Sequence, residues 1–169
     1  MIFNLPLIDI ENNGNKAIAF NTVKQNIHPI SIKSIIPTSN GSAVFLCGKQ
    51  KIFVLYVDKG IGESMQMAID KVQHERPLSH NLITHMLDGL GAEVERVIIN
   101  DVHDGTYFAR LIISMENEIG HKIVELDSRP SDSIILAIHS DKPIYASDNV
   151  IDKVDDMSEI YQKIINTKP

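Results

Sequence analysis

The sequence contains one cysteine, Cys47, and no tryptophan among its 169 residues. A lone cysteine excludes a disulfide within the chain and suits a reducing compartment, so we expect a cytoplasmic protein. No apolar run approaches the roughly 18 residues of a membrane-spanning helix, so we expect no membrane partner. The first residues have neither a basic start nor a long apolar stretch, and we therefore expect no secretory signal.

Several common functional motifs are also missing. The chain has no Cys-x-x-Cys pair and no His-Glu-x-x-His helix, which argues against a structural or catalytic zinc site. It has neither of the common glycine-rich phosphate loops. Residues outside these standard motifs must therefore carry any chemistry on phosphates.

Positive charge is scarce over most of the chain. The net charge is −6, and residues 58–152 hold 17 Asp and Glu against 8 Lys and Arg, a balance of −9. Nonspecific nucleic-acid binders usually carry a basic surface. The excess of acidic residues therefore argues against nucleic-acid binding, although an acidic surface can still surround a local basic groove.

The chain does contain clear patterns of short strands and helices. Alternating apolar residues predict strands at 30–36, 43–47 and 51–57, joined as an antiparallel meander. A helical stripe follows at 62–75, with Met65, Ala68, Ile69 and Val72 on one side.

A second helix is predicted to begin with Ser79 as its N-cap and to end at Gly91. The residues expected on its inward apolar face are Leu82, Ile83, Met86, Leu87 and Leu90.

The strongest hairpin signal lies between residues 93 and 115. Asp104 and Gly105 sit between two β-branched runs, and this pair tolerates the positive φ angles of a type I′ turn. Four further elements are expected, namely a strand at 121–127, a helix at 130–140, a short strand at 143–147 and a helix at 155–166. The residues expected to point inward from the last helix are Ile160, Ile164 and Ile165.

These patterns predict a single compact α+β domain. Its sheet, antiparallel or mixed, is built from meanders and hairpins with three to four inserted helices. We expect an N-terminal extension of uncertain structure at 1–29, the domain itself at 30–152 and a C-terminal helical tail at 153–169. A small sheet with free edges also leads us to expect a homodimer.

Three short motifs occur in an order and at a spacing that resemble one known family. They are PLSH at 77–80, DGTY at 104–107 and DSRPSDSIILA at 127–137. Together they resemble the bifunctional nuclease domain family over about residues 30–152. The chain departs from the usual family pattern at four positions, Ser79, Asn81, Ser133 and Asp141, where Thr, Asp, Ala and Gly are common. The resemblance implies a nuclease acting on DNA, RNA or both, and it brings no agreed catalytic machinery.

The polar motif around residue 130 has two interpretations. As a scaffold, Pro130 suits the first turn of a helix, and Ser131 and Asp132 stabilise the free N–H groups there. Arg129 then clamps strand to helix by pairing with Asp127 or Asp132. As a catalytic site, the same acids and arginine could act on a phosphodiester.

The catalytic interpretation includes a metal ion. Asp127 at a strand end and Asp132 in the following helix could converge on Mg²⁺ or Mn²⁺, with Asp101 as a third ligand. Arg129 between the two acids could bind a phosphate through two hydrogen bonds.

His80 offers a route that needs no metal. At the positive end of a helix the neutral imidazole is favoured, and a neutral ring can act as a general base. The alternative is a solvated histidine in the first turn.

Two function hypotheses follow. One is a nuclease with Asp127, Arg129, Asp132 and His80 as catalytic residues. The other is a non-catalytic oligomeric binding or regulatory module, in which the polar motif serves as scaffold.

Overall fold

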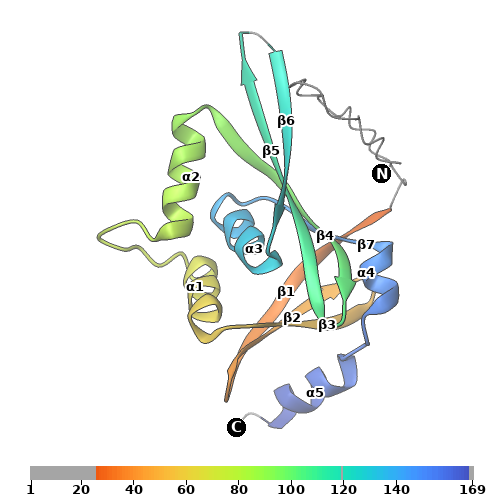
Figure 1. Ribbon diagram of the computed structural model, residues 1–169. Helices are drawn as coiled ribbons and strands as arrows, with labels where there is room; N and C mark the ends of the chain where they lie inside the picture. Colours follow the sequence, from red (N-terminus) through yellow and green to blue (C-terminus); the bar gives the residue numbers. More distant parts are fainter. Residues whose placement is uncertain (1–25, 119, 168–169) are drawn as a thin grey trace.

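A seven-stranded mixed sheet with the strand order β3-β2-β1-β7-β4-β5-β6 forms the centre of the molecule (Figure 1). The computed structural model describes residues 26–118 and 120–167. The strands are β1 (Ile27–Thr38), β2 (Gly41–Gly48), β3 (Lys51–Val57), β4 (Ala92–His103), β5 (Thr106–Asn117), β6 (Gly120–Ser128) and β7 (Ile144–Ser147). Neighbouring strands are antiparallel except β4 and β7, which run parallel, so the predicted α+β fold with a mixed sheet is confirmed.

Five helices accompany the sheet in the described part of the chain, one more than the upper limit of the prediction. They are α1 (Lys59–Ile69), α2 (Ser79–Gly89), α3 (Pro130–His139), α4 (Asp148–Lys153) and α5 (Ser158–Thr167). The helix missing from the prediction is α4, whose six residues are too few for a periodic pattern. Its N-cap is Ser147, whose hydroxyl accepts a hydrogen bond from the Val150 N–H. None of the helices among these residues is long and apolar enough to cross a membrane.

The predicted meander and hairpin are confirmed. Strands β1, β2 and β3 pair in sequence, and β4 pairs with β5 along its length. At the hairpin turn, Asp104 and Gly105 have φ angles of 48° and 76°, the positive values that a type I′ turn requires. The N-terminal extension predicted at 1–29 lies outside the described residues as far as residue 25, and β1 begins at Ile27.

Helix α3 is the most deeply buried helix of the described residues, and α1 and α2 pack against it. Ile134, Ile135, Leu136 and Ala137 are each at most 4% exposed. They belong to two neighbouring apolar clusters, one beneath β1–β3 and α1 and one beneath β4 and β5. In Figure 1, α1 and α2 lie on the same side of the sheet as α3 and flank it. The three helices therefore meet at one place, and the site described below lies there.

The predicted bounds of α1 need correction. The helix ends at Ile69, six residues before the expected end, because Lys71 adopts a left-handed conformation with φ 51° that breaks the helical path. Met65 and Ala68 are buried as predicted, whereas Ile69 and Val72 are exposed.

The start of α2 also differs from the prediction. Ser79 is the first helical residue, and Leu78 occupies the N-cap position instead. The Asn81 side chain accepts a hydrogen bond from the Leu78 N–H at 3.3 Å and so stabilises the helix start in place of a serine cap. Gly91 follows the helix with φ 68°, the left-handed conformation predicted for it.

The predicted inward face of α2 points outward. Leu82, Ile83, Met86 and Leu90 are between 41% and 67% exposed, and no residue of the helix is buried. Only Leu87 of the predicted set packs against the core. Leu82, Ile83, Met86 and Leu90 are called the α2 apolar face below.

Helix α5 shows the same kind of correction. Ile160 and Ile165, predicted to point inward, are exposed, whereas Tyr161 is buried against the ring of Phe45 at a centroid distance of 5.0 Å. Ile164 packs partly against this cluster, so one of the three predicted contacts is present.

Candidate functional site

The first turn of α3 holds an arginine against an aspartate. Arg129 is the N-cap of the helix, and its Nε and Nη2 donate to the two carboxylate oxygens of Asp132 at 2.8 and 3.3 Å. The Arg129 side chain is 68% exposed, so its guanidinium lies at the surface. It is accessible to a ligand, because within the described part of the chain only one edge of its donor fork is used.

A histidine from α2 approaches the same aspartate. His80, in the first turn of α2, places Nε2 at 3.2 Å from Oδ1 of Asp132. Its side chain is 15% exposed. The first turns of α2 and α3 thus meet at one carboxylate, which binds Arg129 on one side and His80 on the other.

The electrostatics of this group favour the charged carboxylate. Partial burial of Asp132 acts to raise its pKa, but the hydrogen bonds from Arg129 and His80 together outweigh burial, and the pKa lies below its ordinary value. The hydrogen bond to Asp132 in turn raises the pKa of Arg129. At neutral pH the site therefore contains a fixed anion and a fixed cation beside an imidazole.

The serines of the same motif have a structural role. Ser131 and Ser133 are buried, and the hydroxyl of Ser133 forms a hydrogen bond with that of Ser128 at the end of β6. This hydrogen bond joins the end of β6 to α3. The motif therefore divides into a buried half that joins strand to helix and a more accessible half, the exposed Arg129 and the partly buried Asp132.

Asp127 does not join this group. It is paired with Arg110 on β5, whose Nη1 lies 3.0 Å from Oδ1 of Asp127. Successive side chains of a strand point to opposite faces, and Ser128 points toward α3, so Asp127 points away from it. Among the residues that the structure describes, Arg129 is consequently paired with Asp132 and not held between two acids.

Asp101 lies at a different place, beside α4. Its Oδ1 accepts hydrogen bonds from Lys153 Nζ at 2.9 Å and from Asn149 Nδ2 at 2.6 Å. The hydrogen bond from Lys153 is the largest cause that lowers the pKa of Asp101 to about 2. Its carboxylate is thus already bound to a cation of the protein.

The three acids suggested as metal ligands are accordingly not brought together. In residues 26–118 and 120–167 no group of three or more His, Cys, Asp or Glu side chains is arranged to hold a metal ion. This arrangement does not fit a Mg²⁺ or Mn²⁺ ion held by Asp101, Asp127 and Asp132.

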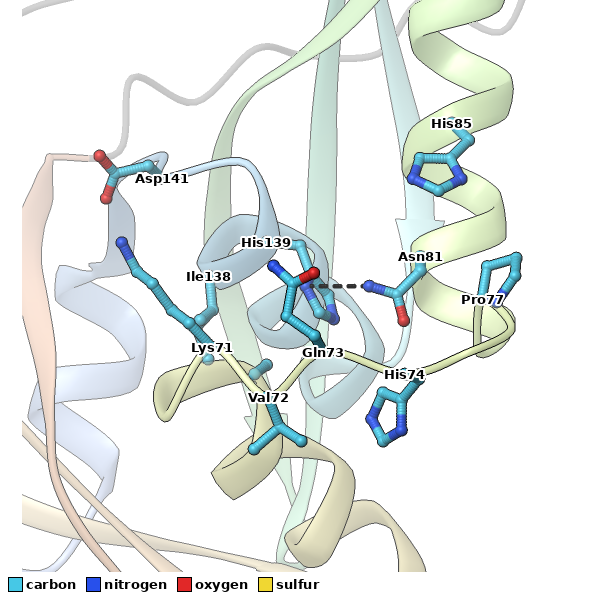
Figure 2. A pocket seen from close by; sticks show the side chains of 11 residues that line it. Lys71, Val72, Gln73, His74, Pro77, Asn81, His85, Ile138, His139 and Asp141 are labelled. Carbon is cyan, nitrogen blue, oxygen red and sulfur yellow. Dashed lines mark hydrogen bonds between the residues drawn. The ribbon is translucent and has the colours of Figure 1, made fainter.

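A cleft of about 410 Å³ opens between α1, α2 and α3 (Figure 2). Its nitrogen-bearing side chains come from the segment after α1, from α2 and from the end of α3, and they are Lys71, Gln73, His74, Asn81, His85 and His139. A smaller hollow shares several of these residues and is also lined by His80. The imidazole of His80 therefore lies next to the cleft.

His139 lies in the middle of the cleft in Figure 2, and its Nδ1 is 3.4 Å from Nδ2 of Asn81. Partial burial lowers its pKa, and the nearby His80 and His74 lower it further. The ring therefore favours its neutral form. Sequence reasoning missed this cleft because residues 71–74, 85 and 139 form no local motif.

The chain is similar to known proteins over part of its length. The model of the family described as bifunctional nuclease domain matches residues 46–158. An uncharacterized protein of Mycobacterium tuberculosis is 33% identical over 100 residues, which are 57% of this chain and 57% of that protein. Bifunctional nuclease 1 of Arabidopsis thaliana is 35% identical over 81 residues, which are 47% of this chain and 24% of that protein. Bifunctional nuclease 2 of the same plant is 36% identical over 83 residues, with the same two shares. The matches thus span less than two thirds of the length of these relatives.

Proposed function

Because the chain belongs to the bifunctional nuclease domain family, we propose that it is a nuclease that hydrolyses phosphodiester bonds of DNA, RNA or both. The observation that carries this proposal is the carboxylate of Asp132, which binds an exposed arginine and a half-buried histidine at once. The names of the two Arabidopsis relatives support the same class of reaction.

In this proposal His80 is the general base. Asp132 accepts the Nε2–H of the ring, which leaves the lone pair of Nδ1 to remove a proton from water. The water oxygen then forms a bond to phosphorus, and the bond from phosphorus to the leaving oxygen breaks. Asp132 stabilises the imidazolium that results, as a carboxylate beside a catalytic histidine does in hydrolases.

Arg129 supplies the positive charge at the phosphate. Its guanidinium is held in place by Asp132 and remains 68% exposed, so its free edge can donate to a phosphate oxygen. The negative charge on that oxygen grows in the transition state, and an arginine fixed in advance stabilises it there more than in the ground state. Each proposed step uses residues of this chain and involves no metal ion.

Replacing Asp132 by Asn tests the proposal. We expect cleavage of single-stranded DNA and RNA oligonucleotides to fall by about 10²-fold or more, because the imidazole loses the group that fixes its tautomer and its charge. The free energy of unfolding should fall by no more than about 1 kcal/mol, the usual limit for an exposed ion pair. Assays with Mg²⁺, with Mn²⁺ and with a chelator should all show cutting by the wild type.

Asp127→Asn is the matched control. It breaks another solvent-accessible ion pair, with Arg110, on the opposite face of β6, and cutting should be unchanged. Loss of cutting in Asp127→Asn but not in Asp132→Asn would place the reaction elsewhere. Absence of cutting by the wild type under all three conditions would contradict the proposed activity.

A second candidate function is supported by the α2 apolar face. In this candidate the protein is a self-associating, non-catalytic binding or regulatory module, and the polar motif serves as scaffold. Helices of about eleven residues are marginal without packing, yet no residue of α2 is buried. We propose a second copy of the chain as the partner. Asp88 is the only Asp, Glu, Lys or Arg within α2, so two copies of this helix meet little repulsion despite the net charge of −6.

Light scattering tests this second candidate. The wild type should be a dimer at micromolar concentration, and Met86→Glu should convert it to a monomer, because a charge buried at the centre of an apolar contact is costly. Ile165→Glu, at an exposed isoleucine of α5, should leave the dimer intact. A wild type that remains monomeric at high concentration contradicts this candidate.

A further inference from the structure

The cleft beside His80 has a composition that the hydrolysis step does not require. Val72, Ile138 and Ala68 give it an apolar part, and Gln73 and Asn81 add side-chain amides. Apolar surface combined with a few convergent polar groups is typical of small-molecule sites. Amides of Asn and Gln also match the hydrogen-bonding edge of a nucleobase, and imidazole rings can stack on its face.

The cleft is also a local exception to the acidic charge of the chain. Lys71 and the three imidazoles of His74, His85 and His139 line it, against a single carboxylate, Asp141. Over residues 58–152 the acids outnumber the bases by 9. An anion therefore meets favourable surroundings here, where cationic and protonatable side chains gather.

From this combination we propose that the cleft binds one nucleotide unit of a single-stranded polynucleotide. The proposal rests on the proposed nuclease function, because it places the strand beside the His80 base. The base of the nucleotide packs on Val72 and Ile138 and is recognised by the amides. Its phosphate binds Lys71, which Figure 2 shows on the opposite side of the cleft from His85.

The size of the cleft favours single-stranded over double-stranded nucleic acid. Its volume of about 410 Å³ is at the lower end of the range for small-ligand sites, which is roughly 300–1,000 Å³. A base that is paired and stacked in a duplex cannot enter a pocket of this kind unless it is first flipped out. A single strand has unstacked bases available at no such cost. We therefore infer a preference for single-stranded over double-stranded substrate.

His139 reports on occupation of the cleft. Its pKa is lowered by burial and by the neighbouring His80 and His74, and the other titratable groups lining the cleft are Lys71, His85 and Asp141. A bound phosphate stabilises the protonated imidazole, so the pKa of His139 should rise when the nucleotide binds. NMR titration of its ring protons with and without ligand measures this change.

Adenosine 5′-monophosphate is the probe, because it contains no phosphodiester and binds without being cut. Calorimetry on the full chain should show it binding more tightly than inorganic phosphate. Lys71→Gln should weaken its affinity roughly tenfold, the usual loss for a charged hydrogen-bond partner. His85→Gln, on the facing wall, should weaken it as well. Lys122→Gln removes an exposed lysine from β6, away from the cleft, and should leave the affinity unchanged.

The outcomes separate this inference from the proposed function. If the wild type cuts nucleic acid but the two cleft variants bind and cut as the wild type does, the cleft inference is wrong and the nuclease proposal stands. If the nucleotide binds no better than phosphate, or if Lys122→Gln weakens it as much as Lys71→Gln, the cleft inference is overturned too. If the nucleotide binds as predicted but no substrate is cut, the cleft is a nucleotide site and the nuclease proposal is wrong.

Discussion

Replacing His80 by Gln is expected to lower phosphodiesterase activity by about 10²- to 10⁴-fold, the usual contribution of a general base. Glutamine keeps a polar group beside Asp132 but cannot take a proton from water. The loss should appear in kcat, with KM little changed, because the cleft residues that hold the substrate are untouched. The measurement is steady-state cleavage of an end-labelled single-stranded oligonucleotide.

A second variant and a control make this result specific. Adding imidazole to His80→Gly should restore part of the activity, since free imidazole can occupy the space of the missing ring. His121→Gln, at an exposed histidine of β6, should behave as the wild type. Full activity in His80→Gln would show that the base lies elsewhere, and would leave Asp132 and Arg129 as a scaffold for the start of α3.

Among substitutions that add one methyl group to α1, Gly62→Ala should cause the largest loss in the free energy of unfolding. A Cβ at Gly62 would lie 2.2 Å from Oγ and 2.5 Å from Cβ of Ser42 on β2, closer than such atoms can approach. The helix must then move away from the sheet. We expect the free energy of unfolding to fall by about 1–3 kcal/mol, as it does when a packed interface is overfilled. Urea denaturation measures it.

Gly60→Ala is the matched control in the same helix. No atom lies within 4 Å of a Cβ at this position, so only the gain in helix propensity remains, up to about 1 kcal/mol. The two substitutions should therefore change stability in opposite directions. Equal stabilisation by both would mean that α1 does not pack closely on β2. Because Lys71 and Val72 follow α1 into the cleft, Gly62→Ala should also weaken nucleotide binding.

The predictions about turns and helix starts that the structure confirms depend on the conformational preferences of residues that are adjacent in the sequence. The turn at Asp104 and Gly105 depends on the φ angles that two residues tolerate, and the start of α3 depends on Pro130 and the residue before it. Such preferences act over a few residues, and packing elsewhere in the chain does not reverse them.

The failed predictions for the end of α1 and the N-cap of α2 concern helix bounds, whereas those for the inward faces of α2 and α5 concern direction. Leu82, Ile83, Met86 and Leu90 do form an apolar stripe at helical spacing, as expected. The spacing defines a face of the helix but not what that face meets. The helix packs on α3 and β4 through the half-buried Asn81 and Thr84 and through Leu87 at the edge of the stripe, so the rest of the stripe faces outward.

For the candidate site, the sequence by itself determined the family resemblance and the helix start, but it left open whether Arg129 pairs with Asp127 or with Asp132. The structure decided for Asp132. Side chains alternate between the two faces of β6. Because Ser128 faces α3, Asp127 lies on the opposite face, where it pairs with Arg110. Tertiary structure alone brought His80 to Asp132 across 52 residues and gathered Lys71, His74, His85 and His139 around one cleft. Local preferences decide which element forms, whereas only the packing of α1, α2 and α3 against one another decides which side chains meet.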